Sequence, residues 1–349
     1  MSTTPCRQSL PPEWAEQSAV MLTWPHRETD WSRRLKIVEP CFAAIAREIS
    51  LREKLLVVCF DTAHRVHVAQ LLRLAAVDLS QVRFHIAPTN DTWSRDHGPI
   101  TVLCRDAPLL LDFGFNGWGG KYPAALDDAV SRHLYDHEIF GQTEMHSVPL
   151  VLEGGSIEVD GQGTLLTTEQ CLLAPTRNPT LSREDLERRL KDLLGLKRIL
   201  WLKHGHLEGD DTDSHIDTLA RFCSANTIAY VACDDPDDTH ADDLKAMEHE
   251  LKSFRAADGS PYRLVPLPWP KPKYSSDGER LPATYANFLI INGAVLVPTY
   301  DDPHDAEALE LLQSCFPNRA IIGINCLPLI EQFGSLHCVT MQFPHGVVT

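Results

Sequence analysis

The sequence predicts an α/β fold made of several similar units, and three observations carry that prediction. Segments with helical apolar spacing alternate along the chain with short apolar segments typical of strands. Gly, Asp and Asn separate many of the strand-like segments, which favours hairpins. The order of helix, strand, turn and hairpin recurs about every sixty residues. Because no flexible linker interrupts this order, we expect a single domain over residues 1–349.

Six segments have the apolar spacing of amphipathic helices. The clearest is 182–194, because Ser182 opens an SRED capping box and Gly195 follows as a typical helix end. Another begins at Pro123, a residue common in the first helical turn. The six predicted helices are 34–49, 62–76, 123–137, 182–194, 242–254 and 303–315.

Short apolar runs between these helices are the predicted strands. The prolines of residues 266–282 predict an exposed extended loop instead. The predicted strands are 55–60, 82–87, 100–104, 109–115, 150–155, 156–161, 163–168, 198–202, 226–233, 262–267, 287–292, 293–299 and 320–324.

The composition limits the kinds of molecule that the protein is expected to bind. The chain has a formal net charge of -16, from 32 basic and 48 acidic side chains, and 43% of its residues are apolar. So large an acidic excess argues against binding to nucleic acid or to an anionic membrane surface, because both are negatively charged. It favours small cations as ligands, although a merely solvated acidic surface explains it as well.

The cysteines and the apolar segments bear on location. No apolar stretch approaches the ~20 residues that span a bilayer, and the N-terminal MSTTPCRQSLPPEW lacks a signal-peptide pattern. Ten cysteines are scattered without a CxxC pair, so a zinc or thioredoxin-type site is not expected. We therefore expect a cytoplasmic protein with reduced thiols, nine of them small buried apolar groups.

Five segments place polar groups among residues that should be buried, and each alone has an ordinary explanation. These explanations are a surface Arg95–Asp96 pair, a Gly-Gly turn, a metal-binding or solvated acidic loop, a turn-stabilising Asn287 and a core Cys338. The segments are DTWSRDHGP (91–99), VLEGGS (151–156), GDDTDSHIDTLARF (209–222), TYANF (284–288) and FGSLHCVTMQF (333–343).

Taken together, the five segments indicate a catalytic site more strongly than any one of them does alone. If IDTLARF is a strand, His215 and Asp217 point to one face and form an acid–base pair. A cysteine with a distant histidine is the general pattern of a thiol nucleophile with an acid–base partner. A surplus of carboxylates beside them fits a flat delocalised cation, bound by forked hydrogen bonds. The carboxylates are Asp96, Glu153, Asp211 and Asp217.

In the same order along the chain, WSRDHGP, FNGWGGK, LEGGSIEVDGQGTLLTTEQCLL, DDTDSHIDTLARF, YANF and LHCVTMQ resemble motifs of the agmatine deiminase family. That family is related to the Porphyromonas-type peptidylarginine deiminases. The resemblance runs from PPEWAEQSAVMLTWPH to GSLHCVTMQ, nearly the whole chain. It implies the fold of the guanidino-group-modifying enzymes, an α/β propeller of five ββαβ modules with pseudo-fivefold symmetry.

The resemblance also implies roles for residues. Cys338 is the expected nucleophile and His215 the general acid/base, while Asp96 and Asp217 hold the guanidinium. The chain departs from the family at Gln332–Cys338, where a Gly-rich run before Asn-Ile-His-Cys is common, and at Asp211, where Glu is common. The expected substrate-binding residues are Trp93, Trp118, Glu153, Asp211 and Asn287.

The implied reaction converts agmatine to N-carbamoylputrescine and ammonia through an amidino-cysteine intermediate. This would place the chain in polyamine metabolism and arginine degradation, with putrescine biosynthesis downstream. The expected partner is a small cationic guanidino substrate, without metal or organic cofactor, and a homo-oligomer is compatible with the sequence. One alternative is deimination of free or peptidyl arginine. Others are a metal-dependent hydrolase with His215, Asp213 and Asp217 as ligands, and a protein that binds the cation without chemistry.

Overall fold

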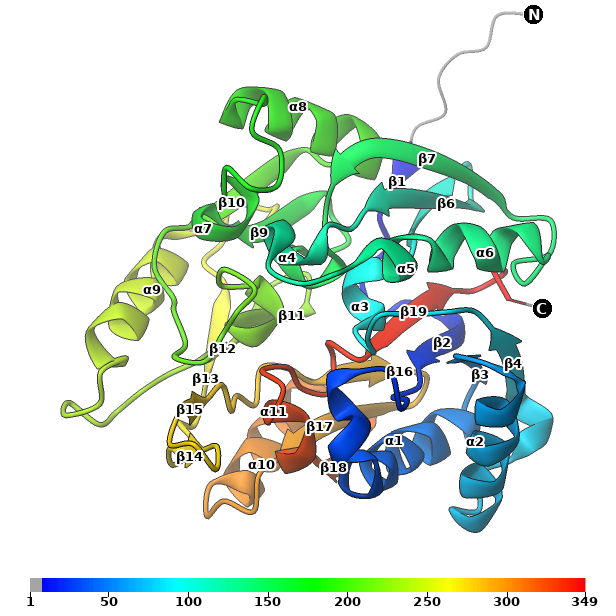
Figure 1. Ribbon diagram of the computed structural model, residues 1–349. Helices are drawn as coiled ribbons and strands as arrows, with labels where there is room; N and C mark the ends of the chain where they lie inside the picture. The colour runs from blue at the N-terminus through cyan, green and yellow to red at the C-terminus, as the bar shows by residue number, and fades with distance from the viewer. Residues whose placement is uncertain (1–7, 349) are drawn as a thin grey trace, which may run out of the picture.

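The computed structural model of the protein describes residues 8–348. Over this range the strands form six separate sheets, of which five have three or four strands and one is a two-stranded hairpin. The longer helices lie on the outside, and the strands lie toward the middle of the molecule (Figure 1). The prediction of an α/β fold is confirmed.

Five of the sheets are built in the same way. Two strands pair antiparallel, a helix follows the second strand, and the next strand pairs parallel to it. In one unit β8 (Glu158–Val159) pairs with β9 (Thr164–Thr168), and α8 (Arg183–Leu194) leads to β10 (Arg198–Leu202). A second unit consists of β5 (Ile100–Cys104), β6 (Ala107–Gly114), α6 (Val130–Asp136) and β7 (Glu144–Val151). A third consists of β11 (Ala220–Ser224), β12 (Thr227–Val231), α9 (Ala241–Ser253) and β13 (Arg263–Leu267). A fourth consists of β16 (Leu289–Ile291), β17 (Ala294–Thr299), α10 (Asp305–Cys315) and β18 (Ala320–Asn325).

The fifth unit joins the two ends of the chain. The C-terminal β19 (Thr340–Pro344) pairs antiparallel with β2 (Gln17–Thr23), as the red and blue arrows of Figure 1 show. After β2 come α1 (Leu35–Ser50) and the parallel strand β3 (Lys54–Cys59), and α2 (Thr62–Leu74) with β4 (Val82–Ile86) extends this sheet. The segment that carries Cys338 is therefore held against the N-terminal sheet.

Five of the six predicted helices have nearly the predicted bounds: α1, α2, α8, α9 and α10. For α8 the Ser182 side chain accepts from the amide of Asp185, and Gly195 ends the helix with a φ of 68°. The predicted helix 123–137 is instead broken at Ala129 into α5 (Ala125–Asp128) and α6. The carboxylates of Asp127 and Asp128 accept from backbone amides of other loops, and these bonds hold the first turn apart from α6.

Two predicted strands near the polar motifs are wrong in part. The strand predicted over 150–155 ends at Val151, since Gly154–Ser156 turns into the 3-10 helix η3. The strand considered for 216–222 begins only at Ala220, because Ile216–Thr218 forms the 3-10 helix η4. The predicted loop 266–282 contains a small hairpin of β14 (Lys273–Tyr274) and β15 (Arg280–Leu281).

The remaining short elements connect these units. They are β1 (Gln8–Ser9), α3 (Ser94–His97), α4 (Gly117–Gly120), α7 (Glu169–Leu172), α11 (Leu327–Ile330), and the 3-10 helices η1 (Asp30–Arg33) and η2 (Leu79–Gln81). None of the helices described is long and apolar enough to cross a bilayer. Cys104 at the end of β5 is disulfide-bonded, so the expectation of reduced thiols is wrong at this position.

Candidate active site

Three of the predicted site residues meet beside Gly155. A Cβ built on Gly155 would lie 2.6 Å from His215 Nδ1, 3.0 Å from Asp96 Oδ1 and 3.1 Å from Asp217 Oδ2. All three side chains are at least 96% buried. The glycine therefore leaves a small enclosed space bounded by two carboxylates and an imidazole.

His215 and Asp217 reach this space by a turn and not by sharing a strand face. The Thr218 hydroxyl donates to the carbonyl of His215 over 2.9 Å and closes the η4 turn. Asp213 and Ser214, just before His215, both have a positive φ. Such backbone conformations are costly for side-chain-bearing residues and persist only where the surroundings fix them. The prediction that His215 and Asp217 lie close together is confirmed, but a 3-10 turn brings them together and not one face of a strand.

Asp96 is placed by the short helix α3 and is held at both oxygens. Its Oδ2 accepts from the indole of Trp118 over 2.9 Å, and its Oδ1 accepts from the amide of Gly155 over 3.0 Å. His215 Nδ1 lies 3.7 Å from Oδ1. Burial raises the pKa of Asp96 well above its ordinary value, and the charges of Asp217 and Glu153 raise it further.

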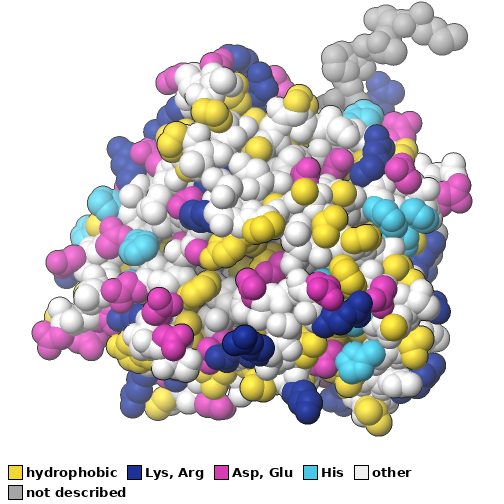
Figure 2. Space-filling view, in the orientation of Figure 1, with side chains coloured by type: hydrophobic (Ala, Val, Ile, Leu, Met, Phe, Trp, Pro, Cys, Tyr) yellow, Lys and Arg dark blue, Asp and Glu magenta, His cyan; other side chains and the backbone are white. Residues whose placement is uncertain are grey.

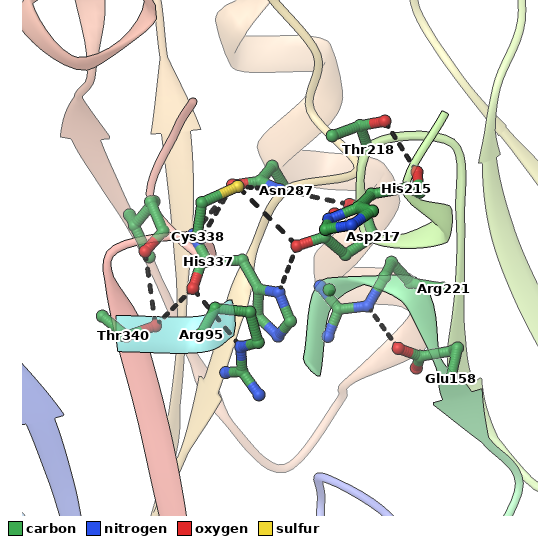
Figure 3. A network of polar contacts seen from close by, with 12 residues as sticks. Arg95, Glu158, His215, Asp217, Thr218, Arg221, Asn287, His337, Cys338 and Thr340 are labelled. Carbon is green, nitrogen blue, oxygen red and sulfur yellow. Dashed lines mark hydrogen bonds and ion pairs between the residues drawn. The ribbon is translucent and has the colours of Figure 1, made fainter. Parts of the chain in front are cut away.

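Cys338 lies two residues before β19, and its side chain points toward Asp217 and Asn287 (Figure 3). Its Sγ is 3.7 Å from Asp217 Oδ2 and 3.3 Å from Asn287 Nδ2. The amide of Arg95 donates to the carbonyl of Cys338, which connects the segment before β19 to α3. Burial, followed by Asp217 and Asp96, raises the pKa of Cys338 well above that of an ordinary thiol. The free chain therefore holds this side chain as a thiol.

Asn287 connects the segments that carry the thiol and the carboxylate. Its Nδ2 donates to the carbonyl of Asp217 over 3.3 Å, and its Oδ1 accepts from the amide of His337 over 2.8 Å. The side chain is fully buried, so these contacts satisfy polar atoms that would otherwise be unpaired. Asn287 thus fixes the distance between Cys338 and Asp217.

His337 was quoted in the sequence motif but was not predicted as a site residue. Its Nδ1 contacts Asp217 Oδ2 and its Nε2 contacts Glu13 Oε1, both at 2.8 Å. Burial, Arg221 and Arg95 lower the pKa of His337, yet only the imidazolium can donate to both carboxylates, and the two short contacts favour that form. Burial alone would raise the pKa of Asp217, but the hydrogen bond and charge of His337 hold it below its ordinary value.

Two buried arginines complete this layer and were also missed. Arg221 on β11 donates to Glu158 over 2.7 Å and pairs with Glu13 over 2.5 Å. Arg95 pairs with Glu13 over 3.3 Å, so the surface Arg95–Asp96 pair considered for this segment is wrong. The available signal was an arginine within the apolar run ARFCS, because a buried arginine needs carboxylate partners.

Glu153 lies beside His215, and its carboxylate is paired with the guanidinium of Arg177. Both of its oxygens accept from Arg177 Nε, at 2.8 and 3.1 Å, and the side chain is fully buried. One carboxylate oxygen, Cys171 Sγ and a ring nitrogen of His215 all lie within 4.8 Å of one another. Burial raises the pKa of Glu153, and Arg177 opposes that shift. Its expected direct contact with a substrate stays a prediction.

The geometry does not favour the metal-dependent alternative. Asp213 pairs with Arg177 over 2.6 Å and with Lys121 over 2.8 Å, while Asp217 pairs with His337. Two of the three suggested ligands are thus engaged by cationic or donor side chains. Over residues 8–348, Asp213, His215 and Asp217 do not form a group with metal-ligand spacing.

Trp118 lies between Asp96, to which its indole donates, and Tyr122, which lines a surface hollow of about 620 Å³. Trp118 packs edge-on against Trp93 at 6.5 Å and against Tyr122 at 5.6 Å between ring centroids. The Tyr122 hydroxyl donates to Asp211 Oδ2 over 2.9 Å. Asp211 therefore lies at the hollow, away from the Asp96 and Asp217 pair. Residues that line the hollow include Tyr122, Glu208, Asp210, Asp211, Glu279 and Phe333.

Comparison with known proteins gives a consistent set of relatives. The sequence pattern of the Porphyromonas-type peptidyl-arginine deiminases matches residues 9–344. An agmatine deiminase from Ectopseudomonas mendocina is 34% identical over 99% of this chain and 98% of its own. A crystal structure from Porphyromonas gingivalis, provisionally named an arginine deiminase, is 51% identical, with a TM-score of 0.92 over 98% of this chain and 100% of its own. A cysteine-to-serine variant of agmatine deiminase from C. jejuni, solved with substrate bound, is 37% identical, with a TM-score of 0.91 over 99% of each chain.

Proposed function

The chain belongs to the family of Porphyromonas-type peptidyl-arginine deiminases, and from that premise we propose that it converts agmatine to N-carbamoylputrescine and ammonia. It is an enzyme of the agmatine deiminase type. Relatives named agmatine deiminase match it over almost their full length. We include in the proposal that the chain is one domain whose five repeated units surround a common pseudo-fivefold axis.

One observation carries the proposal. Both ring nitrogens of His215 and the Oδ1 of Asp217 are buried and have no hydrogen-bond partner among residues 8–348. Buried polar atoms without partners cost free energy, so such atoms indicate a ligand that supplies the missing contacts. A guanidinium is flat, cationic and carries donors in a fixed fork, which suits the two carboxylates on either side of Gly155.

The first chemical step forms a bond between Cys338 Sγ and the guanidinium carbon. A bound cation would offset the negative charge of Asp217 and Asp96, which lowers the pKa of the thiol. Burial lowers the pKa of His215 to about 3, so the imidazole is neutral and can accept the thiol proton. His215 then delivers a proton to one departing nitrogen, the carbon–nitrogen bond breaks, and ammonia leaves.

The second step hydrolyses the amidino-cysteine. The neutral His215 takes a proton from water, and the resulting hydroxide attacks the amidino carbon. The carbon–sulfur bond then breaks, the ureido product leaves, and the protonated His215 returns its proton to the sulfur of Cys338. Asp96 and Asp217 hold the reacting group in one plane throughout, which supplies the orientation that a delocalised, poorly electrophilic carbon needs.

The surface hollow supports agmatine over arginine. Asp211, Glu208 and Glu279 line it, and burial raises the pKa of Asp211 to about 6. The lining also contains Arg280, but its guanidinium is paired with Asp238 over 2.6 Å and lies 3.8 Å from Glu208. The free amine of agmatine is a cation and is attracted by these carboxylates. The carboxylate that arginine carries at the same end would meet charges of its own sign. A peptide backbone would also have to reach past the tryptophans to bring its guanidinium to Gly155.

The proposal is tested by incubating the purified chain with agmatine, arginine and an arginyl peptide, with a chelator present. We expect ammonia and ureido product with agmatine. The absence of product with all three compounds would remove the proposal, and product with arginine alone would move it to the alternative substrate.

A pair of cysteine variants tests the nucleophile. Cys338→Ala should abolish turnover while the thermal unfolding temperature stays close to that of the native chain, because a small buried group is replaced by another. Cys233→Ser, which changes a partly exposed thiol, is the matched control and should retain turnover. Turnover by the Cys338 variant would contradict the assignment.

A further inference from the structure

Three histidines form a cluster that the proposed reaction does not use. His85 lies on β4, His133 lies on α6, and His137 follows the end of α6. One ring nitrogen from each lies within 4.8 Å of the others. The rings of His133 and His137 are stacked with centroids 4.3 Å apart, and the ring of His85 stands edge-on to both at 5.0 Å. Figure 2 shows histidine side chains gathered on the surface over α6.

One hydrogen bond of the cluster fixes the tautomer of His137 and leaves one of its ring nitrogens free of hydrogen. His137 Nδ1 lies 2.8 Å from the carbonyl of His133. A carbonyl only accepts, so Nδ1 carries the proton and Nε2 has the lone pair that a metal requires. Such a hydrogen bond to the second nitrogen is the usual way in which a metal-binding histidine is oriented. His85 Nε2 and His133 Nδ1 lie 2.8 Å apart and share one proton.

A metal ion would take the place of the proton between His85 Nε2 and His133 Nδ1. That proton would leave to solvent or move to the other nitrogen of the same ring, because a nitrogen that binds a metal must be free of hydrogen.

We propose that His85, His133 and His137 form a binding site for one borderline divalent transition-metal ion, with Zn²⁺ as its occupant. Three imidazole nitrogens with a fourth position open to water make a tetrahedral set that suits Zn²⁺. Such a set discriminates against Ca²⁺ and Mg²⁺, which require oxygen ligands. Metal–nitrogen bonds of about 2.0–2.1 Å separate tetrahedral ligands by about 3.3 Å, so the His85 and His133 nitrogens need to move apart by only about half an ångström.

The position of the cluster assigns the ion a structural role. β4 is the edge strand of the sheet that joins the two chain ends, whereas α6 belongs to the next unit, with β5, β6 and β7. The two units already meet through an apolar cluster that includes Val58, Val130 and Phe140. Arg83 also donates to the carbonyl of Ile139 across this boundary. A metal bound by all three histidines would link the units and stabilise the boundary against thermal unfolding.

Binding of Zn²⁺ to the full chain, measured by calorimetry, tests the proposal. The measurement is made in a Cys338→Ala background, so that the active-site thiol cannot bind the metal. We expect one Zn²⁺ per chain and a rise in unfolding temperature when it is added. His137→Ala removes the exposed ligand without disturbing the core, and we expect it to weaken binding by about ten- to a hundredfold or more. His146→Ala, which removes an exposed histidine of β7, is the matched control and should bind as the parent does.

Co²⁺ identifies the ligands. Bound at this site, it should show visible absorption bands without the charge-transfer band that a cysteine ligand produces, and His85→Gln should remove those bands. The proposal is overturned if no saturable binding occurs, if the parent and His137→Ala bind Zn²⁺ with equal affinity, or if Co²⁺ shows a sulfur band. Deiminase activity measured with a chelator does not depend on this ion, so failure here leaves the proposed function standing.

Discussion

Gly155 is the residue on which the geometry of the site depends most directly. Replacing it with Ala would place a methyl group within 3.1 Å of atoms of His215, Asp96 and Asp217, in the space assigned to the guanidinium. We expect kcat/KM to fall by about a hundredfold or more, because displacement of the reacting carbon by about an ångström has that effect. Steady-state kinetics with agmatine measure it.

Gly114→Ala is the matched control for that substitution. Its added Cβ meets no atom nearer than 3.7 Å, so it should leave both kinetics and stability nearly unchanged. Equal losses of activity in the two variants would mean that a general effect of losing glycine is being measured. An active Gly155→Ala enzyme would place the substrate elsewhere.

The thiol of Cys338 should titrate differently with and without its neighbouring carboxylate. Burial and Asp217 raise its pKa, so alkylation of the free chain by iodoacetamide should increase through the alkaline range and be slow at neutral pH. Asp217→Asn removes a negative charge next to the sulfur. The pKa should fall, and the alkylation profile should move to lower pH.

Asp211→Asn serves as the control for the alkylation experiment. Asp211 lies at the hollow and is not among the groups that raise the pKa of the thiol. Its substitution should leave the alkylation profile in place. A shift toward higher pH in Asp217→Asn would contradict the assigned electrostatics, since it would mean that the carboxylate stabilises the thiolate.

The segment before Cys338 is the element in which this chain departs from the family motif. Phe333 has a φ of 65°, a conformation that glycine adopts without cost, and it lines the surface hollow. Gly334 lies against the ring of Trp93 so closely that a Cβ there would overlap it. The segment therefore places the ring of Phe333 at the hollow and packs its backbone at Gly334 against the ring of Trp93.

Phe333→Gly should separate substrate binding from chemistry. Removing the ring loses an apolar contact of about 1 kcal/mol, so KM for agmatine should rise roughly fivefold. We expect kcat to change little, because Cys338, His215 and Asp217 keep their contacts. Relief of the left-handed strain offsets the greater freedom of glycine in the unfolded chain, so the unfolding temperature should change little. A large loss of kcat at unchanged KM would contradict this division.

Elements with a strong local signal were predictable from the sequence, and those made by turns were not. α8 carries its own cap and end signal, and its predicted bounds are nearly those observed. The 3-10 helices η3 and η4 depend on glycines and on single hydrogen bonds, which apolar spacing does not reveal. The β19–β2 pairing joins residues more than 300 positions apart, and nothing in the sequence around Cys338 identifies so distant a partner.

The candidate site shows the same division. Polar residues in conspicuous motifs, such as Asp96 and Cys338, were predicted, and the structure brings them together. Glu13, His337 and Arg221 were missed, because they come from three distant segments and only their mutual contacts explain why His337 and Arg221 are buried beside the partly buried Glu13. Buried charges are stable in such a layer when each is paired, so the missing residues could have been sought by asking what pairs an arginine within an apolar strand.

At the scale of the whole molecule, the charge of -16 should influence the capture of substrate. Agmatine carries two positive charges, whereas butylguanidine has a similar length and carries only one. An acidic protein attracts the dication more strongly at a distance, and salt screens that attraction over about 10 Å at 0.1 M. We therefore expect kcat/KM for agmatine to fall with ionic strength more steeply than kcat/KM for butylguanidine.

Kinetics of both compounds from low to high concentrations of sodium chloride measure this effect. Osmotically matched sucrose is the control, because it changes water activity without screening charge. If the two compounds show the same dependence on salt, the net charge plays no part in capture, and the acidic surface serves solvation alone. If the steeper salt dependence of kcat/KM for agmatine is present in the native chain and disappears in Asp211→Asn, the attraction comes from the hollow and not from the net charge of the whole molecule.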